Sequence, residues 1–304
     1  MTWIWILAGL VGLLLVLIVA AVAVMYRNPR KAHQHTPEKF DIPFQDVRFP
    51  TKNNRKLYGW WIPAKDKSPA PTLVLVHGWG RNVERMLPYI RRLHASGYNL
   101  LAFDSRNHGS SDPDHYSSML KFAEDIIAAV DFVQKQPEAD RERIGLIGLS
   151  IGGAASIYAA AQDPRIKSVV TVGAFAHPGE VMRYEFRQHH IPFFPLVWLL
   201  FKYVEFRIGA KLDAIAPVKN IHRANASIFL IHGEKDVIVP PGQAHQLESA
   251  GNPEKVHLWL IPEKGHSDCH FHPEFWGKVE SFLEQTLHAQ KTQNQARKDK
   301  FQDD

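Results

Sequence analysis

The chain has 304 residues, 45% of them hydrophobic and 22% charged, which is enough apolar material for one large α/β domain or two small ones. This composition excludes intrinsic disorder over most of the chain. The formal net charge of +5 is small for this length and the basic residues are scattered, so nucleic acid is not expected as a partner.

The first element is an uncharged apolar segment from Trp3 to Met25. A helix of that length, rising about 1.5 Å per residue, spans a bilayer core of about 30 Å. We therefore expect a single-pass transmembrane anchor over residues 1–26. A cleaved secretory signal is the alternative, because AVA at residues 21–23 offers a small-x-small site. The segment is too long for a signal and no basic region precedes it, which favours the anchor.

The flanks of this segment predict its orientation. The two residues before it carry no Lys or Arg, whereas Arg27, Arg30 and Lys31 follow it. Because basic flanks stay on the cytoplasmic side, we expect the bulk of the protein in the cytoplasm, tethered to the membrane. The lone cysteine, Cys269, agrees with this, since it leaves no internal disulfide that would indicate an oxidising compartment.

A polar linker is expected over residues 27–43, and one domain over residues 44–288. In that domain short apolar runs alternate with amphipathic stretches, which predicts a mostly parallel sheet flanked by helices. The expected strands are KLYGWWIP, TLVLVHG, YNLLAFD, RIGLIGLS, IKSVVTVG, ASIFLIHG and KVHLWLIP. The expected helices are Val83–Leu93, Met119–Val133, Ile151 to about Ala161, and a last one through Phe275 and Leu283. Residues 289–304 read as a polar tail.

One of these strands ends in a serine between two glycines: Ser150 follows RIGLIGL, with Gly148 before it and Gly152 after it. At a strand-to-helix junction this G-x-S-x-G pattern favours a sharp, strained turn that exposes the serine hydroxyl. Such a turn needs glycine on both sides of the serine, because a side chain at either position would collide with the neighbouring strand or helix. The alternative is a serine that only caps the helix. A nucleophilic serine also needs a histidine base that a carboxylate orients.

A carboxylate and a histidine that could partner Ser150 both lie later in the chain. Asp236 lies in the turn after ASIFLIHG, and His266 follows KVHLWLIP. Side chains beyond the carboxyl ends of parallel strands gather at one edge of the sheet, so we expect Ser150, Asp236 and His266 to lie together as catalytic residues. Glu234, two residues from Asp236 in the same turn, is the rival acid.

An oxyanion in this chemistry needs preorganised hydrogen-bond donors. The sequence HGWG at residues 77–80 leaves an early strand with glycines that let a substrate approach the backbone. The backbone N–H groups of Trp79 and Ile151 are the expected donors. Asp104 and His108, in the turn DSRNHGSSD, could replace members of the triad, but we interpret them as turn and hydrogen-bonding residues.

Five motifs, in this order, resemble the α/β-hydrolase superfamily over the domain: HGWG, DSRNHGSSD, GLSIGG, HGEKDVIVP and GHSD. The resemblance implies an α/β-hydrolase fold with a helical cap, no cofactor, and Ser150, Asp236 and His266 as nucleophile, acid and base. One departure is Asn107, where related sequences often carry glycine. Asparagine tolerates positive φ, so the turn can survive.

The alternation of strands and helices breaks over residues 174–220, where the cap is expected. Its segment IPFFPLVWLLFKYV is too short to span a bilayer, but long enough for one helix that covers an apolar pocket or rests in the membrane interface. Phe194, Trp198 and Phe201 are then expected to bind the acyl chain of a substrate. The alternative is an ordinary cap helix that packs on its own domain.

The histidine-rich sequence HSDCHFH has the residue types of a metal site, but its spacings match no zinc pattern, so no metal is expected. His189 and His190 are expected at the surface of the insertion.

Together these patterns predict a membrane-anchored serine hydrolase that cleaves small-molecule carboxylic esters or thioesters, a class of substrates that includes lipids. The first alternative is a peptidase or amidase of the same fold, because the acid turn also resembles prolyl-oligopeptidase relatives. The second is a catalytically silent scaffold.

Overall fold

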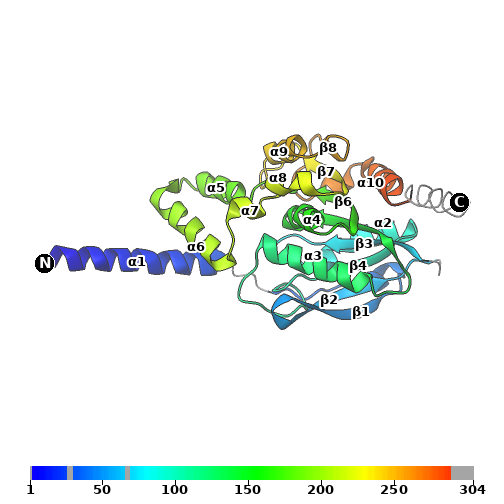
Figure 1. Cartoon of the computed structure of the whole chain (residues 1–304), viewed down its shortest axis with the longest axis horizontal. Coiled ribbons are helices and arrows are strands. Elements are labelled where there is room, and N and C mark those ends of the chain that lie inside the picture. Colours follow the sequence, from blue (N-terminus) through cyan, green and yellow to red (C-terminus); the bar gives the residue numbers. More distant parts are fainter. Residues whose placement is uncertain (1, 26–29, 66–68, 289–304) are drawn as a thin grey trace, which may run out of the picture.

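The computed structural model describes residues 2–25, 30–65 and 69–288. Over these residues one eight-stranded sheet runs in the order β1-β2-β4-β3-β5-β6-β7-β8, and helices pack on both of its faces (Figure 1). The β1–β2 and β2–β4 pairs are antiparallel, and the other pairs are parallel. The mostly parallel sheet flanked by helices that the sequence predicts is therefore confirmed.

Among the described residues, seven of the eight strands match those expected from the sequence, and the first strand, β1, is one that the sequence patterns did not predict. The strands are β1 (Gln45–Thr51), β2 (Arg55–Ile62), β3 (Ala70–Val76), β4 (Asn99–Phe103), β5 (Ala139–Leu149), β6 (Ile166–Val172), β7 (Ser227–Gly233) and β8 (Val256–Ile261). The helices are α1 (Thr2–Met25), α2 (Leu87–Ala95), α3 (Met119–Val133), α4 (Ile151–Gln162), α5 (Pro178–Gln188), α6 (Trp198–Ile208), α7 (Leu212–Ile215), α8 (Pro217–Asn220), α9 (Gly242–Ala250) and α10 (Phe275–Leu283).

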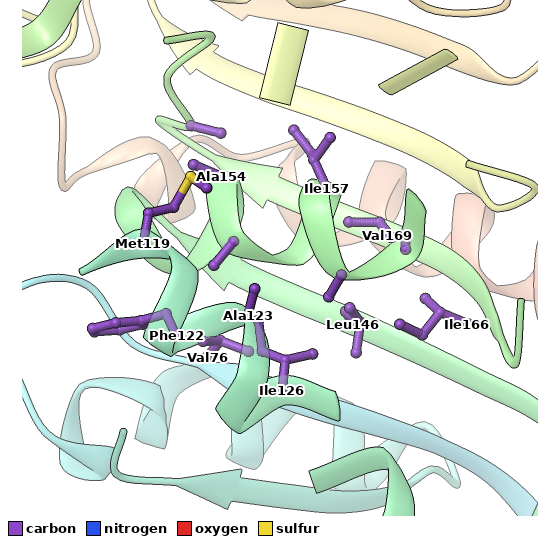
Figure 2. Packing of buried hydrophobic residues seen from close by; sticks show 14 of the residues in the cluster. Val76, Met119, Phe122, Ala123, Ile126, Leu146, Ala154, Ile157, Ile166 and Val169 are labelled. Carbon is purple, nitrogen blue, oxygen red and sulfur yellow. The ribbon is translucent and has the colours of Figure 1, made fainter. Parts of the chain in front are cut away.

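The side chains of β3 show why this strand lies at the centre of the sheet. Val74 and Val76 join the core cluster under α3 and α4, whereas Leu73 and Leu75 join the cluster under α2 and α10. Successive side chains of a strand face opposite sides of the sheet, so an apolar run without interruption is buried on both faces. Figure 2 shows the first of these clusters, with Val76, Phe122, Ala123, Ile126, Leu146, Ala154 and Ile157 packed together.

At the N-terminal end, α1 projects from the domain and is contacted by α6 (Figure 1). Its side chains Trp3 and Trp5 are exposed, and several of its other side chains fall outside the described residues. Across the part of the chain that the structure describes, no helix proves long and apolar enough to cross a membrane, so the transmembrane anchor predicted over residues 1–26 is not supported. Residues 26–29 of the predicted anchor and linker, and the tail 289–304, lie outside the described residues. The cytoplasmic location stays a prediction.

Two predicted helices are interrupted. The helix expected over Val83–Leu93 is a short 3₁₀ turn, Val83–Met86, followed by α2, which has Pro88 in its first turn. In the insertion between β6 and β7, the segment IPFFPLVWLLFKYV does not form one helix, because α6 begins only at Trp198. Phe194 is extended, with φ −103° and ψ 139°, since the residue before a proline is disfavoured in the helical region.

The turn after β4 is held by a buried ion cluster. The guanidinium of Arg106, 1% exposed, lies 3.3 Å from Asp114, 2.5 Å from Glu124 and 2.7 Å from Asp125. Burial raises the pKa of Asp125 to about 6 even though Arg106 opposes that shift. Asn107, in the same turn, has φ 66°, so the turn does use the positive φ that asparagine tolerates.

Replacing the cation of this cluster should destabilise the fold far more than removing a surface cation. We expect Arg106→Met to lower the free energy of unfolding by about 3–5 kcal/mol, because it leaves Asp125 buried without its cation. The matched control is Lys235→Met, which breaks an exposed pair with Glu263 and should cost about 1 kcal/mol or less. Urea unfolding at pH 7.5 measures both, and equal losses would contradict this interpretation.

Candidate active site

Ser150 lies between the end of β5 and the start of α4, at φ 53° and ψ −120°. Residues with side chains adopt this conformation rarely, and it persists only where the surroundings hold it. Here the Ser150 N–H donates to the Val172 carbonyl at 2.8 Å, and the Ala154 N–H donates to the Ser150 carbonyl at 3.0 Å. The strained turn expected from the G-x-S-x-G pattern is therefore present.

Gly148 and Gly152 allow α4 to approach the sheet closely enough for that turn. A Cβ atom at Gly152 would lie 2.5 Å from the carbonyl oxygen of His77, and one at Gly148 would overlap the Gly152 carbonyl. No larger residue fits at either position without moving backbone. The glycines thus set the geometry of the turn at Ser150.

The predicted acid and base meet beyond β7 and β8. His266 Nδ1 lies 2.7 Å from Asp236 Oδ2, and Asp236 is 3% exposed. Burial acts to raise the pKa of Asp236, but hydrogen bonds from His232, His266 and the Val239 N–H hold it well below its usual range. The carboxylate is therefore ionised and can only accept a hydrogen bond, so His266 carries its proton on Nδ1 and leaves Nε2 as the basic nitrogen. The rival acid, Glu234, is exposed to solvent.

A cavity of about 290 Å³ brings Ser150 and His266 to one place. Trp79, in the loop after β3, also lines it. This loop lies against the serine, because a Cβ atom at Gly78 would be 3.5 Å from the Ser150 Cβ. Ile151 is the first residue of α4, and the first N–H groups of a helix have no partner inside it. Both residues predicted as oxyanion donors are thus next to the predicted nucleophile.

Two buried histidines hold the Trp79 loop. His77 Nδ1 donates to the Gly78 carbonyl at 2.8 Å, and its Nε2 accepts from the Ser105 N–H at 3.1 Å. His108 Nε2 accepts from the Gly80 N–H at 3.3 Å, and its Nδ1 donates to a backbone carbonyl at 2.9 Å. Each ring has one donor and one acceptor, which is the neutral form. Burial lowers the pKa of His77 to about 4 and that of His108 to about 3.

Asp104 has a similar structural role. Its carboxylate accepts from the backbone N–H groups of Val83 at 2.6 Å and Ser110 at 2.8 Å. Asp104 and His108 are therefore turn and hydrogen-bonding residues, as interpreted from the sequence. Over the described residues no cluster of three or more His, Cys, Asp or Glu side chains could hold a metal ion.

Sequence reasoning missed two residues of the site. His232 Nε2 lies 3.2 Å from Asp236 Oδ2 and 2.8 Å from the Val239 carbonyl oxygen. Gly173, at φ 67°, lies under the imidazole, where a Cβ atom would be 3.0 Å from His266 Nδ1. Their only signals in the sequence are a histidine four residues before the acid and a glycine that ends a strand.

The three cap residues predicted to bind substrate lie elsewhere. Phe194 is 71% exposed, and none of Phe194, Trp198 and Phe201 lines the cavity of Ser150. Trp198 and Phe201 instead line a second cavity of about 940 Å³ between the cap and α9. Helices α5 and α6 extend away from the sheet towards α1 (Figure 1), and Phe201 packs on Phe193 with ring centroids 5.7 Å apart. A role of these three residues in substrate binding stays a prediction.

Comparisons with known proteins find several hydrolases that are similar to this chain. A family model described as serine aminopeptidase, S33, matches residues 67–202. The solved structure of an esterase from Pyrococcus furiosus has a TM-score of 0.68 and 25% identity, over 86% of this chain and 100% of the esterase.

Two curated fungal proteins match over shorter stretches. The thiohydrolase aneE of Aspergillus aculeatus is 34% identical over 140 residues, which are 45% of this chain and 43% of its own. The polyketide transferase grgF of a Penicillium species is 31% identical over 134 residues, 43% of this chain and 45% of its own. The chain thus spans less than half the length of these relatives.

The neutral histidines of the Trp79 loop should make the fold sensitive to mild acid. The pKa of His77 falls from 6.5 to about 4 on folding, so between these values the unfolded chain binds the proton and the folded chain does not. The stability that neutral His77 contributes to the fold is complete above pH 6.5 and is lost as the pH falls towards 4. The free energy of unfolding then changes by up to about 1.4 kcal/mol per pH unit. His77→Gln should flatten the slope in urea unfolding between pH 7 and pH 4.5, whereas His222→Gln, which removes an exposed imidazole, should keep it. Equal slopes in wild type and His77→Gln would contradict this account.

Proposed function

We propose that this chain, which belongs to the α/β-hydrolase superfamily of serine hydrolases, cleaves carboxylic esters or thioesters through an acyl-enzyme. The observation that carries the proposal is one cavity lined by Ser150, at its strained turn, and by His266, which is paired with an ionised Asp236. The likeness to an esterase and to a thiohydrolase supports an acyl oxygen or sulfur ester as the substrate.

The first half of the reaction makes the acyl-enzyme. Ser150 Oγ attacks the carbonyl carbon of the substrate and gives its proton to His266 Nε2. The backbone N–H groups of Trp79 and Ile151 donate to the oxyanion of the tetrahedral intermediate. The C–O or C–S bond then breaks, and His266 passes the proton to the leaving alcohol or thiol.

The second half repeats these steps with water. His266 takes a proton from a water molecule, whose oxygen attacks the acyl carbon. The bond to Ser150 Oγ breaks, the serine regains its proton from His266, and the carboxylic acid leaves. Asp236 stays ionised throughout and stabilises the imidazolium of each half. His232 and the Val239 N–H keep the Asp236 carboxylate in place for this.

Amide cleavage is the second candidate, because the matching family model is described as a serine aminopeptidase. An aminopeptidase would hydrolyse alanine 4-nitroanilide, which offers a free α-amino group beside the scissile amide. We expect turnover of 4-nitrophenyl acetate without turnover of this amide. The opposite result would favour the peptidase.

Substitutions in the triad should separate the three roles. Ser150→Ala or His266→Ala should lower kcat for 4-nitrophenyl acetate by a factor on the order of 10⁶, and Asp236→Asn by about 10⁴. The matched control is Glu234→Gln, which changes the exposed carboxylate of the same turn and should keep its activity. Circular dichroism checks that each variant is folded. Turnover by Ser150→Ala within about tenfold of wild type would remove Ser150 as the nucleophile, and loss in Glu234→Gln with full activity in Asp236→Asn would move the acid.

Gly173→Ala tests whether His266 must hold its position. Both Gly173, at φ 67°, and Gly97, at φ 85°, should lose about 1–2 kcal/mol of stability when replaced by alanine, because a Cβ atom disfavours positive φ. A Cβ atom at Gly97 meets open space, whereas one at Gly173 meets the imidazole of His266. Gly173→Ala should therefore lower kcat by roughly 10–100-fold while Gly97→Ala does not. Equal kcat values in the two variants would contradict the positioning of His266 by Gly173.

A further inference from the structure

Two arginines border the cavity that Ser150 and His266 share. Arg81, which is exposed, and Arg85, which is half-buried, both line it. Of the described residues that line this cavity, none is acidic. The opening to the predicted nucleophile is therefore flanked by positive charge.

No carboxylate neutralises these two side chains within the described part of the chain. Glu84, which lies between them in sequence, is engaged elsewhere: it accepts from the Gln34 N–H at 2.8 Å and pairs with His35 at 2.7 Å. Over the described residues neither guanidinium has a carboxylate within 4.0 Å, and Arg85 donates instead to the Ser267 carbonyl at 3.1 Å. Charged groups left without a counter-charge at a cavity rim attract ligands of the opposite sign.

The contact between Arg85 and Ser267 locates this charge relative to the reaction. Ser267 directly follows His266 in sequence, so Arg85 lies on the same side of the cavity as the proposed general acid. In the proposed reaction His266 protonates the leaving group. The leaving alcohol or thiol would thus depart beside the two arginines.

We propose that Arg81 and Arg85 form an anion subsite, which selects esters or thioesters whose alcohol or thiol half carries an anionic group. This inference rests on the proposed function and adds a substrate class to it. The half-buried Arg85 makes the stronger contact, because a charge-assisted hydrogen bond gains strength where water is partly excluded. The exposed Arg81 adds attraction that salt screens.

The test compares two substrates that differ in charge and little else, the acetyl esters of 4-hydroxybenzoate and 4-hydroxybenzamide, with the full chain. The readout is the ratio of kcat/KM for the anionic ester to that for the neutral one. We expect a ratio of roughly 10 at low ionic strength, falling towards 1 in about 0.5 M salt. Arg81→Gln should lower the ratio by roughly threefold, Arg85→Gln by more, and the double variant should bring it to about 1.

Two controls exclude a general effect of charge or folding. Arg91→Gln removes a cation from α2 that lies over the Phe40 ring, 5.2 Å from its centroid, and should leave the ratio unchanged. Arg85→Lys keeps the charge and should recover most of the preference lost in Arg85→Gln.

The outcomes separate this inference from the proposed function. A ratio near 1 in wild type, with hydrolysis that depends on Ser150, would overturn the anion subsite alone. So would a preference that survives the double substitution, or one that appears only when the charge is moved to the acyl half, as in mono-4-nitrophenyl glutarate. Absence of hydrolysis that depends on Ser150 for either ester would overturn the proposed function and the subsite with it.

Discussion

The close approach of α4 to the ends of β3 and β5 is the contact on which the whole site depends. It exists because Gly148 and Gly152 carry no side chains where the backbones meet. That approach forces Ser150 to positive φ and places the first N–H of α4 beside it. It also brings the loop after β3 against the serine. A change of packing at this one junction would therefore move Ser150, the proposed nucleophile, together with both proposed oxyanion donors.

The remaining groups of the site lie around this junction at the edge of the sheet. They comprise a paired carboxylate, two neutral histidines and two arginines. Asp236 is buried, ionised and matched by two histidines. His77 and His108 are neutral and support backbone. Among the described residues that line the cavity, Arg81 and Arg85 have no carboxylate partner, so the buried pair of Asp236 and His266 lies beside a positively charged rim. The proposed reactivity thus depends on the buried pair, and the proposed preference among substrates depends on the rim.

Local signals in the sequence explain what could be predicted. The helix Met119–Val133 and the run of strands follow from apolar periodicity, and Ser150, Asp236 and His266 follow from motifs at strand ends. The cap could not be placed in this way, since Pro195 divides the expected helix and the direction of α5 and α6 depends on contacts outside the segment. Gly173 was missed for the same reason, because its role exists only through its contact with His266, which follows a different strand. His232 was missed although it contacts Asp236 in the turn after its own strand, because a spacing of four residues does not by itself indicate that contact.

If Ser150 is a nucleophile that His266 activates, it should react covalently with a fluorophosphonate. A fluorophosphonate reacts with an activated serine oxygen and loses fluoride, so the adduct can be located by mass spectrometry of peptides. We expect a single adduct on the peptide that contains Ser150, no adduct in Ser150→Ala, and much slower labelling in His266→Ala. A folded wild-type chain that takes no label, or that is labelled on a different serine such as Ser267, would contradict this role of Ser150.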